Sequence, residues 1–496
     1  MRPALAAAGA VPADSASVGE RAVRGVLTLG LREGVMKLLA FGGDIALYRL
    51  LTPADFGVIV PVAFLAGMAK QFADLGLQPS LIQRAAEPSP RDLRAVFTAQ
   101  LALVTLAAAV VVLAGPSLVA GLLGNTVDPW LIRVFALSIL FSALRIVPAA
   151  LLERHLRFGR LATADIAGTL TYYAAGIGFA IGAAGVWSLA FAHVGASVTA
   201  TAVLLALRPW PPIPTIRLGA IRPLISFGSR YQGARLALML KDALIPLFAP
   251  RAFGARDTGL LSWADKIAAQ PLTPTQLVAR VSLPAFARIQ AEPDAVRRGA
   301  ELTLKWNAIV TLPAFAAVVA FGPEIARYIY GEAWVPAVPA LYVLTINAML
   351  VPVNGLITPV LNALGRTRIV LAVALAWAAL AWVVATVLTS AGLGFMAVPA
   401  GLVGTQALAA AVLLPLAHRE FGLRLLRHLG KPTVAALVAG GIGRLVLLPL
   451  LTDAVLLVQG GLVVVLVYAG VLYGLDRAAL RTELAGLLAR RRTGRA

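Results

Sequence analysis

The sequence predicts an all-α polytopic membrane protein of about 14 transmembrane helices, with two pseudo-symmetric six-helix lobes around a central cavity plus two extra C-terminal helices. Three observations support this fold class. Of the 496 residues, 59% are hydrophobic and 13% are charged, and the mean hydropathy is +0.85, which is more apolar surface than a soluble core buries. Apolar residues also gather in long uninterrupted stretches, and basic residues alternate between the segments that join them.

Each predicted span is about 18 to 27 residues long, sufficient to cross about 30 Å of hydrocarbon as a helix. The spans lie at residues 25–50, 56–79, 93–115, 129–152, 161–184, 186–207, 223–249, 258–281, 300–321, 335–362, 367–390, 395–417, 432–450 and 454–475.

The basic residues provide a test of this count. With the N-terminus in the cytoplasm, eight alternate segments hold 27 of the 43 Lys and Arg residues, whereas the opposite loops hold four. Cytoplasmic loops of membrane proteins carry such an excess. We therefore expect a multi-pass protein of the bacterial cytoplasmic (inner) membrane with both termini in the cytoplasm.

Short motifs in the first half of the chain recur about 202 to 205 residues later, and this internal repeat, or sequence echo, divides the chain into two halves. Asp55-Phe56-Gly57 corresponds to Asp257-Thr258-Gly259, and Glu87-Pro88 corresponds to Glu292-Pro293. Six spans per repeat place both halves in the same orientation. The expected divisions are a cytoplasmic N-terminal tail (1–22), an N-lobe (23–210), a C-lobe (211–424), two additional spans (425–476) and a basic cytoplasmic tail (477–496).

Spans one, two, seven and eight carry ionisable residues in their interiors. A charge facing lipid costs at least about 2.5 kcal/mol near a helix centre, so these residues predict a water-filled cavity. The bases are Arg32, Lys37, Lys70, Arg230, Arg235, Lys241 and Lys266, and the acids are Glu33, Asp44, Asp74, Asp242 and Asp265.

The bases of this set exceed the acids by two, and such a cavity attracts an anionic group. The forked donors of Arg suit a phosphate, so we expect the seven bases to bind a pyrophosphate or glycan substrate. The five acids either bind a coupling ion or proton or pair with the bases. The alternative that every charge is paired, and only ties helices together, stays open.

Outside this set, the polar residues of the spans have structural interpretations. Pro271 and Pro274 each remove a helix hydrogen bond and predict a kink that is either static or gating. We expect Arg133, Arg145, Asp165 and Lys305 to make isolated helix–helix or interface contacts.

Several function classes lack residues to support them. The chain has no cysteine and four scattered histidines, so no metal site or cofactor is expected. The net charge of +20 follows from basic loops and does not indicate nucleic acid as a partner. We find no acid/base pair in an aqueous loop and no phosphate-binding glycine loop, and therefore do not expect an enzyme.

The start of the chain resembles a known family. Leu50-Leu51-Thr52-Pro53-Ala54-Asp55-Phe56-Gly57, Phe72-Ala73-Asp74-Leu75-Gly76-Leu77 and Leu81-Ile82-Gln83-Arg84 are similar to the opening of polysaccharide repeat-unit flippases. These form the polysaccharide transporter branch of the multidrug/oligosaccharidyl-lipid/polysaccharide exporter superfamily and serve lipopolysaccharide and exopolysaccharide biosynthesis. Ala54 departs from the family, which often has an acid there.

The resemblance implies a lipid-linked oligosaccharide flippase that turns polyprenyl-pyrophosphate-linked repeat units across the inner membrane by alternating access. It implies a cavity lined by spans one, two, seven and eight, with the two additional spans shaping a groove for the lipid tail. Expected partners are the lipid-linked oligosaccharide, membrane lipid, a glycan polymerase and the export machinery.

Two other functions, one in transport and one in catalysis, remain open at this point, with a non-transporting scaffold as a third and weaker option. One is a cation-coupled multidrug antiporter of the same superfamily, which would favour an acidic or aromatic cavity. The other is a membrane-embedded glycan polymerase or acyltransferase, which generally needs a catalytic His or a large outer loop.

Overall fold

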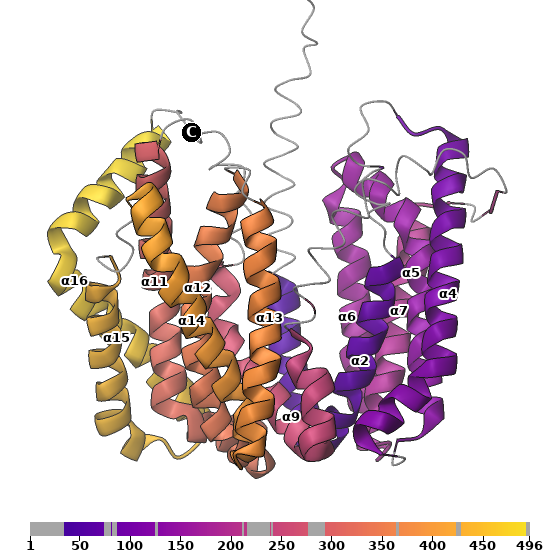
Figure 1. The fold of residues 1–496 in the computed structure, drawn as a ribbon, viewed down its shortest axis with the longest axis horizontal. Helices are drawn as coiled ribbons and strands as arrows, with labels where there is room; N and C mark the ends of the chain where they lie inside the picture. Colours follow the sequence, from indigo (N-terminus) through magenta and orange to yellow (C-terminus); the bar gives the residue numbers. More distant parts are fainter. Residues whose placement is uncertain are drawn as a thin grey trace, which may run out of the picture. The chain divides into compact units, whose positions relative to one another are not determined.

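Helices make up the regular structure of the described residues (Figure 1). The computed structural model describes residues 34–73, 81, 87–124, 127–210, 213–215, 239, 242–275, 293–363, 367–422 and 428–492. Within them it leaves out the side chains of 293, 296, 353, 355–363, 367–371, 416, 417, 420, 421 and 478–492. The predicted all-α fold class is confirmed.

The chain forms two compact units, and the first comprises Met1–Leu51 and Pro61–Arg235. It contains a helix at 34–50, most of α2 (Pro53–Ala73), α4 (Pro90–Leu123), α5 (Pro129–Arg154), α6 (Phe158–Ile181) and α7 (Trp187–Leu207). Both α4 and α5 begin with an N-cap followed by proline: Ser89 forms a capping box with Asp92, and Asp128 accepts from the Trp130 N–H at 2.9 Å. Such caps satisfy N–H groups that a helix start leaves open.

Small residues allow α6 and α7 to pack closely. A methyl group on Gly168 would lie 2.9 Å from the Ala200 Cβ, and one on Gly176 would lie 3.3 Å from the Ala192 Cβ. Close backbone approach is the usual way in which membrane helices gain packing contacts. Leu152, Ala164 and Leu204 form a shared buried cluster of α5, α6 and α7.

The second unit comprises Thr52–Val60 and Leu236–Ala496. Its helices are the start of α2, η1 (Leu244–Phe248), α9 (Ala249–Ala269), η2 (Gln270–Leu272), α11 (Pro293–Glu324), η3 (Ile325–Tyr330), η4 (Glu332–Ala337), α12 (Val338–Ala363), α13 (Thr367–Ser390), η5 (Gly394–Met396), α14 (Ala397–Phe421), α15 (Gly430–Ile442), η7 (Gly443–Leu447), η8 (Leu448–Leu450) and α16 (Ala454–Arg492).

The helix order of the first unit recurs in the second. The starts of α4, α5, α6 and α7 are followed 203 to 210 residues later by those of α11, α12, α13 and α14. This agrees with the spacing of the sequence echo and indicates a duplicated helix arrangement. The domain boundaries at 210 and 424 stay a prediction.

Two C-terminal helices, α15 and α16, lie beside α11 (Figure 1). Phe315 and Phe321 of α11 share a buried cluster with Ala439 of α15 and Val464 of α16. The backbone of α16 leaves helical geometry at Asp476 (φ −133°, ψ 24°). The predicted span end at 475 coincides with this break, but the helix then resumes to Arg492, through most of the predicted basic tail.

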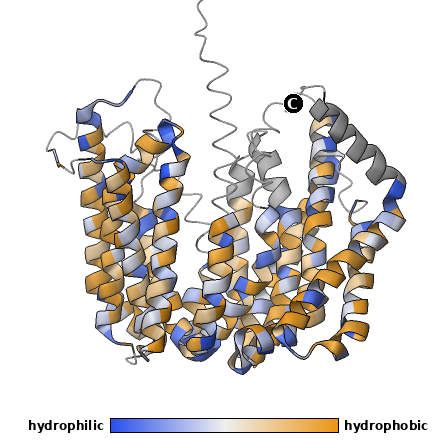
Figure 2. Ribbon diagram, turned by 180° about the vertical axis from the view of Figure 1, so that it is seen from behind, coloured by the Kyte–Doolittle hydropathy of each residue, from blue (hydrophilic) through white to orange (hydrophobic). Residues whose placement is uncertain are grey.

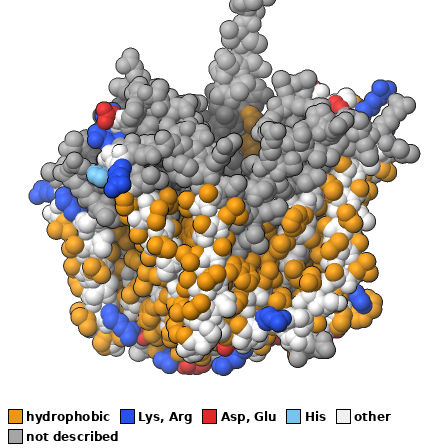
Figure 3. Space-filling model, in the orientation of Figure 1, with side chains coloured by type: hydrophobic (Ala, Val, Ile, Leu, Met, Phe, Trp, Pro, Cys, Tyr) orange, Lys and Arg blue, Asp and Glu red, His pale blue; other side chains and the backbone are white. Residues whose placement is uncertain are grey.

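Ten helices among the described residues are long and apolar enough to cross a membrane. Hydrophobic residues predominate along them (Figure 2), and Lys and Arg side chains gather near helix ends on the face drawn in Figure 3. The other four predicted spans are α6 and α9, which carry more polar residues, and 25–50 and 223–249, which are only partly described. A multi-pass membrane protein is confirmed, whereas the count of 14 stays a prediction.

Candidate functional site

The first turns of α2 cross α9 with their backbones in contact, both within the second unit. A methyl group on Gly57 would lie 1.6 Å from the carbonyl oxygen of Ala255, and one on Gly259 would lie 1.8 Å from the carbonyl oxygen of Pro53. Real Cβ atoms essentially never come within 3.0 Å of another heavy atom. Only glycine therefore fits at either position.

This crossing is reciprocal. Pro53 precedes Gly57 by four residues, and Ala255 precedes Gly259 by four residues. Each glycine therefore contacts the residue that lies four positions before the other glycine. The two glycines that end the triplets of the sequence echo, Gly57 and Gly259, thus both lie at this crossing within the second unit.

Local sequence positions both helices for this contact. The Thr52 N–H donates to Asp55 Oδ2 at 2.9 Å, and the Asp55 N–H donates to Thr52 Oγ1 at 3.3 Å, a capping box that starts α2. In α9 the backbone turns at Gly254 (φ 81°), and the Thr258 hydroxyl donates to the Gly254 carbonyl at 2.7 Å. The predicted break between span seven, which ends at 249, and span eight, which starts at 258, contains this kink, at which two helices meet within α9.

Aromatic rings surround the crossing. Phe56 stands edge-on to Trp334 with 5.6 Å between ring centroids, and Trp334 stacks on Trp263 at 6.0 Å. Trp263 in turn meets Tyr330 at 5.4 Å. Trp263 and Trp334 are completely or almost completely buried, so the crossing is set in a packed aromatic core.

A polar cluster occupies the first unit. The Tyr173 hydroxyl donates to Asp44 Oδ1 at 3.1 Å. Gly43 leaves room for this tyrosine, because a methyl group there would lie 2.0 Å from the ring. Of the predicted cavity acids, Asp44 is therefore held by a specific partner from α6.

Two further residues of the cluster come from α2 and α7. His193 stacks on Phe135 with 4.3 Å between ring centroids, and Tyr172 stands edge-on to the same histidine at 6.5 Å. The charge of Lys70 acts on this imidazole. Neither Tyr172 nor Tyr173 was predicted from the sequence as a site residue. The signal in the sequence was Gly42-Gly43, directly before Asp44, because Gly43 leaves the space that the Tyr173 ring fills.

The predicted cavity residues divide into three groups. Lys37, Asp44 and Lys70 lie in the first unit, with both lysines exposed. Asp242, Asp265 and Lys266 lie in the second, with both acids exposed and the lysine half-buried. Outside the described residues are Arg32, Glu33, Asp74, Arg230, Arg235 and Lys241. Their assembly around one cavity stays a prediction.

The predicted kink falls at the end of α9. Pro271 is buried within the 3₁₀ turn Gln270–Leu272, and Pro274 follows it. The structure has a change of helix type here, as a missing N–H donor requires. Whether this turn gates transport stays a prediction.

Ion pairs confirm the contacts expected of Arg145, Asp165 and Lys305, whereas Arg133 lies over the Trp130 ring of its own helix, 4.9 Å from the ring centroid. Arg145 Nη2 lies 2.7 Å from Asp165 Oδ1, joining α5 to α6. Lys305 Nζ lies 3.3 Å from Asp476 Oδ2, joining α11 to α16, and Lys431 of α15 pairs with the same carboxylate. In the described part of the chain, no three His, Asp or Glu side chains gather as a metal site.

Comparison with known proteins identifies relatives. The family model described as "Polysaccharide biosynthesis protein" matches residues 46–339, more than half of the chain. The chain is 24% identical over 356 residues to the lipopolysaccharide biosynthesis protein WzxC of Escherichia coli (strain K12), covering 70% of this chain and 69% of that protein. It is 24% identical over 284 residues to the teichuronic acid biosynthesis protein TuaB of Bacillus subtilis (strain 168), covering 56% and 58%.

A solved structure extends the likeness in fold. The lipid II flippase MurJ, in an inward closed conformation, superposes with a TM-score of 0.72 at 14% identity, covering 92% of this chain and 100% of that chain. At this identity the similarity concerns the fold, and function has to be argued from the site.

Proposed function

The chain belongs to the polysaccharide biosynthesis protein family, and we propose that it is a flippase for lipid-linked oligosaccharides. Its substrate is a polyprenyl-pyrophosphate-linked repeat unit, which it turns across the inner membrane by alternating access. The observation that carries this proposal is the family match over residues 46–339, which falls on a multi-pass membrane protein. It favours a flippase over a multidrug antiporter, since the matched family serves polysaccharide biosynthesis.

The exposed charges of the two units support a water-filled path. Lys37 and Lys70 are exposed on 34–50 and α2, and Asp265 is exposed on α9. In lipid each would cost at least about 2.5 kcal/mol, whereas water in a cavity would hydrate them. We propose that the seven predicted bases hold the pyrophosphate there while the prenyl tail stays in lipid.

We assign energy coupling to the acids among the predicted cavity residues. Asp44 accepts a hydrogen bond from the Tyr173 hydroxyl, and the first unit also contains His193 and Lys70. We propose Asp44 as a site at which a proton or cation is coupled to transport.

The charge asymmetry orients the chain in the membrane, because the predicted cytoplasmic segments carry the Lys and Arg excess. The resemblance to polysaccharide repeat-unit flippases supports entry of the substrate from the cytoplasmic leaflet and release to the outer leaflet. The glycan polymerase and export machinery would then act on the product. Both termini are cytoplasmic in this arrangement.

A deletion strain tests the function directly. We expect lipid-linked oligosaccharide to accumulate, protected in spheroplasts from a glycan probe added outside. Plasmid-borne wild-type protein should restore surface glycan. Unchanged surface glycan with no accumulating lipid, together with efflux of cationic dyes by the purified protein, would instead identify an antiporter.

A further inference from the structure

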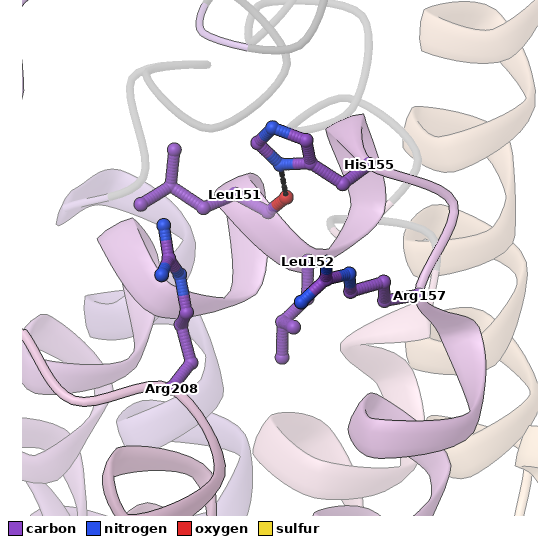
Figure 4. A pocket seen from close by; sticks show the side chains of 5 residues that line it. All are labelled: Leu151, Leu152, His155, Arg157 and Arg208. Carbon is purple, nitrogen blue, oxygen red and sulfur yellow. Dashed lines mark hydrogen bonds between the residues drawn. The ribbon is translucent and has the colours of Figure 1, made fainter.

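A small cavity in the first unit lies apart from the charged residues discussed so far. Its volume is about 90 Å³, and it is lined by Leu151, Leu152, His155, Arg157 and Arg208. α5 ends, α6 begins and α7 ends around it. Figure 4 shows the two arginine side chains on opposite sides of this space, each directed toward the last turn of α5.

The two arginines of this cavity differ from their neighbours. Arg154 donates to the Leu81 carbonyl at 3.1 Å, and Arg160 donates to the Leu207 carbonyl at 3.1 Å. Among the described residues, neither Arg157 nor Arg208 has a side-chain hydrogen bond or ion pair. The two guanidinium groups that enter the cavity thus have no hydrogen-bond or ion-pair partner within the part of the chain that the structure describes.

A tight turn positions these groups. The Leu156 N–H donates to the Glu153 carbonyl at 2.9 Å, and the Arg157 N–H donates to the Leu152 carbonyl at 2.8 Å, closing α5 in a Schellman motif. Leu156 has φ +55°, where a non-glycine residue costs about 1 to 2 kcal/mol. The turn sets His155 on one side of Leu156 and Arg157 on the other.

The electrostatic surroundings favour an anion. The His155 Nδ1 lies 2.6 Å from the Leu151 carbonyl oxygen, and its Nε2 lies 3.4 Å from Glu87 Oε1. Glu87 is thus engaged by the histidine and not by either cavity arginine. α6 starts after Arg157 without a side-chain cap, so its positive end adds to the field.

The position of the cavity indicates the source of that anion. α5 and α7 are each long and apolar enough to span a membrane, and His155, Arg157 and Arg208 of the cavity lie within three residues after the ends of these spans at Arg154 and Leu207. Residues at this level meet lipid headgroups. A volume of about 90 Å³ equals that of about three liquid waters, which suits a single phosphate group and is too small for a nucleotide.

From these contacts we propose that Arg157 and Arg208 bind the phosphate of an anionic membrane lipid. The two forked guanidinium groups supply charge-assisted donors from opposite sides. Leu151 and Leu152 line the apolar part of the cavity. An anionic headgroup is preferred over a zwitterionic one because it brings no ammonium group to compete with the arginines.

Native mass spectrometry of the purified full-length protein tests this site, with phosphatidylglycerol and phosphatidylcholine as probes. We expect one phosphatidylglycerol to be retained in preference to phosphatidylcholine. The double variant Arg157→Gln/Arg208→Gln should lose it, with affinity lower by at least about tenfold. The charge-matched control Arg133→Gln/Arg327→Gln removes arginines that contact Trp130 and Glu332 instead and should keep the lipid.

Two further measurements keep the proposal testable. If the double variant does not fold, the single Arg157→Gln variant, which changes an exposed side chain, should still weaken binding, while Arg157→Lys should retain part of it. Equal phosphatidylglycerol binding by wild type and the glutamine variants would overturn the site. Displacement of the lipid by millimolar sn-glycerol 3-phosphate would show a soluble phosphate ligand and overturn the lipid assignment.

Discussion

At the scale of single residues, two kinds of arginine stand out in the first unit: one that pairs with a carboxylate on another helix, and two that line a cavity. Arg145 and Asp165 are the clearest pair, with side chains 29% and 17% exposed. Arg157 and Arg208 are the contrasting case in the same unit. The difference lies in what the neighbouring helix presents: α6 offers a carboxylate to Arg145, whereas the other residues that line the cavity of Arg157 and Arg208 are two leucines and a histidine.

The Arg145 pair gives a stability prediction. Arg145→Met leaves the Asp165 carboxylate in a partly buried site without its cation, and we expect a loss of about 2 kcal/mol, below the roughly 3 to 5 kcal/mol for fully buried pairs. The double variant Arg145→Met/Asp165→Leu should recover most of it. Unfolding in detergent measures both, and equal loss in single and double variants would contradict the interpretation.

The proposed phosphate-binding bases give an activity prediction. Lys37→Ala should abolish export, because one charge that holds the pyrophosphate is lost, while Lys37→Arg should retain export. Arg235→Ala should behave as Lys37→Ala does. Surface glycan is the measured quantity, with membrane insertion checked in parallel; full export by both alanine variants would remove the phosphate-binding role and leave the flippase proposal standing.

At the scale of elements, the start of α2 and the body of α9 depend on two glycines. The Ala255 carbonyl occupies the space that a side chain at Gly57 would need, and the Pro53 carbonyl occupies the space that a side chain at Gly259 would need. Because both obstacles are backbone atoms, no rotamer change can relieve the overlap. The crossing itself has to open or shift.

We therefore predict that Gly57→Ala and Gly259→Ala each lower the unfolding midpoint and impair export. Gly67→Ala is the matched control within α2, since nothing lies within 4 Å of a methyl group there. It should leave both properties unchanged or raise stability by up to about 1 kcal/mol through helix propensity. Equal effects of Gly57→Ala and Gly67→Ala would show that the close contact does not persist in the membrane.

At the scale of the whole molecule, α2 belongs to both compact units. Residues up to Val60 are part of the second unit, and Pro61 begins the part that belongs to the first. Proline lacks an N–H group, so the carbonyl of Gly57, four residues earlier, has no helix donor. α2 therefore lacks one backbone hydrogen bond where it passes from the second unit to the first.

This boundary gives a prediction about transport rate. Pro61→Ala restores the missing helix hydrogen bond and should stiffen α2, so we expect a folded protein of equal or higher stability with slower transport. Initial rates of lipid flipping in proteoliposomes measure this. Pro116→Ala in α4, which lies within the first unit, is the control; equal slowing by both variants would argue against a special role of Pro61.

Much of the helical framework could be predicted from the apolar stretches. The span at 367–390 coincides with α13, and that at 186–207 differs from α7 by one residue. Bilayer thickness sets the length of such segments, so one-dimensional hydropathy suffices. The predicted break between residues 249 and 258 likewise contains Gly254, where the backbone leaves helical geometry within α9.

The candidate site was less predictable. Asp44 and Lys70 were recognised as polar residues within apolar spans, but Tyr172, Tyr173 and His193 had no signal in periodicity that tied them to these charges. These residues come together because α6 packs beside both the helix at 34–50 and α7. The helix at 34–50 is far from α6 in the sequence. The open arginines at 157 and 208 resemble ordinary loop arginines in the sequence.

The sequence by itself determined that this is a multi-pass helical membrane protein, that its helix pattern is duplicated and that its family serves polysaccharide biosynthesis. These properties depend on local composition and spacing, which the bilayer translates directly into helices. Only the tertiary structure decided that Gly57 and Gly259 meet, that Asp44 is held by Tyr173, and that Arg157 and Arg208 face one cavity. Such contacts join residues far apart in the chain, and they arise from side-chain packing between helices, which hydropathy does not encode.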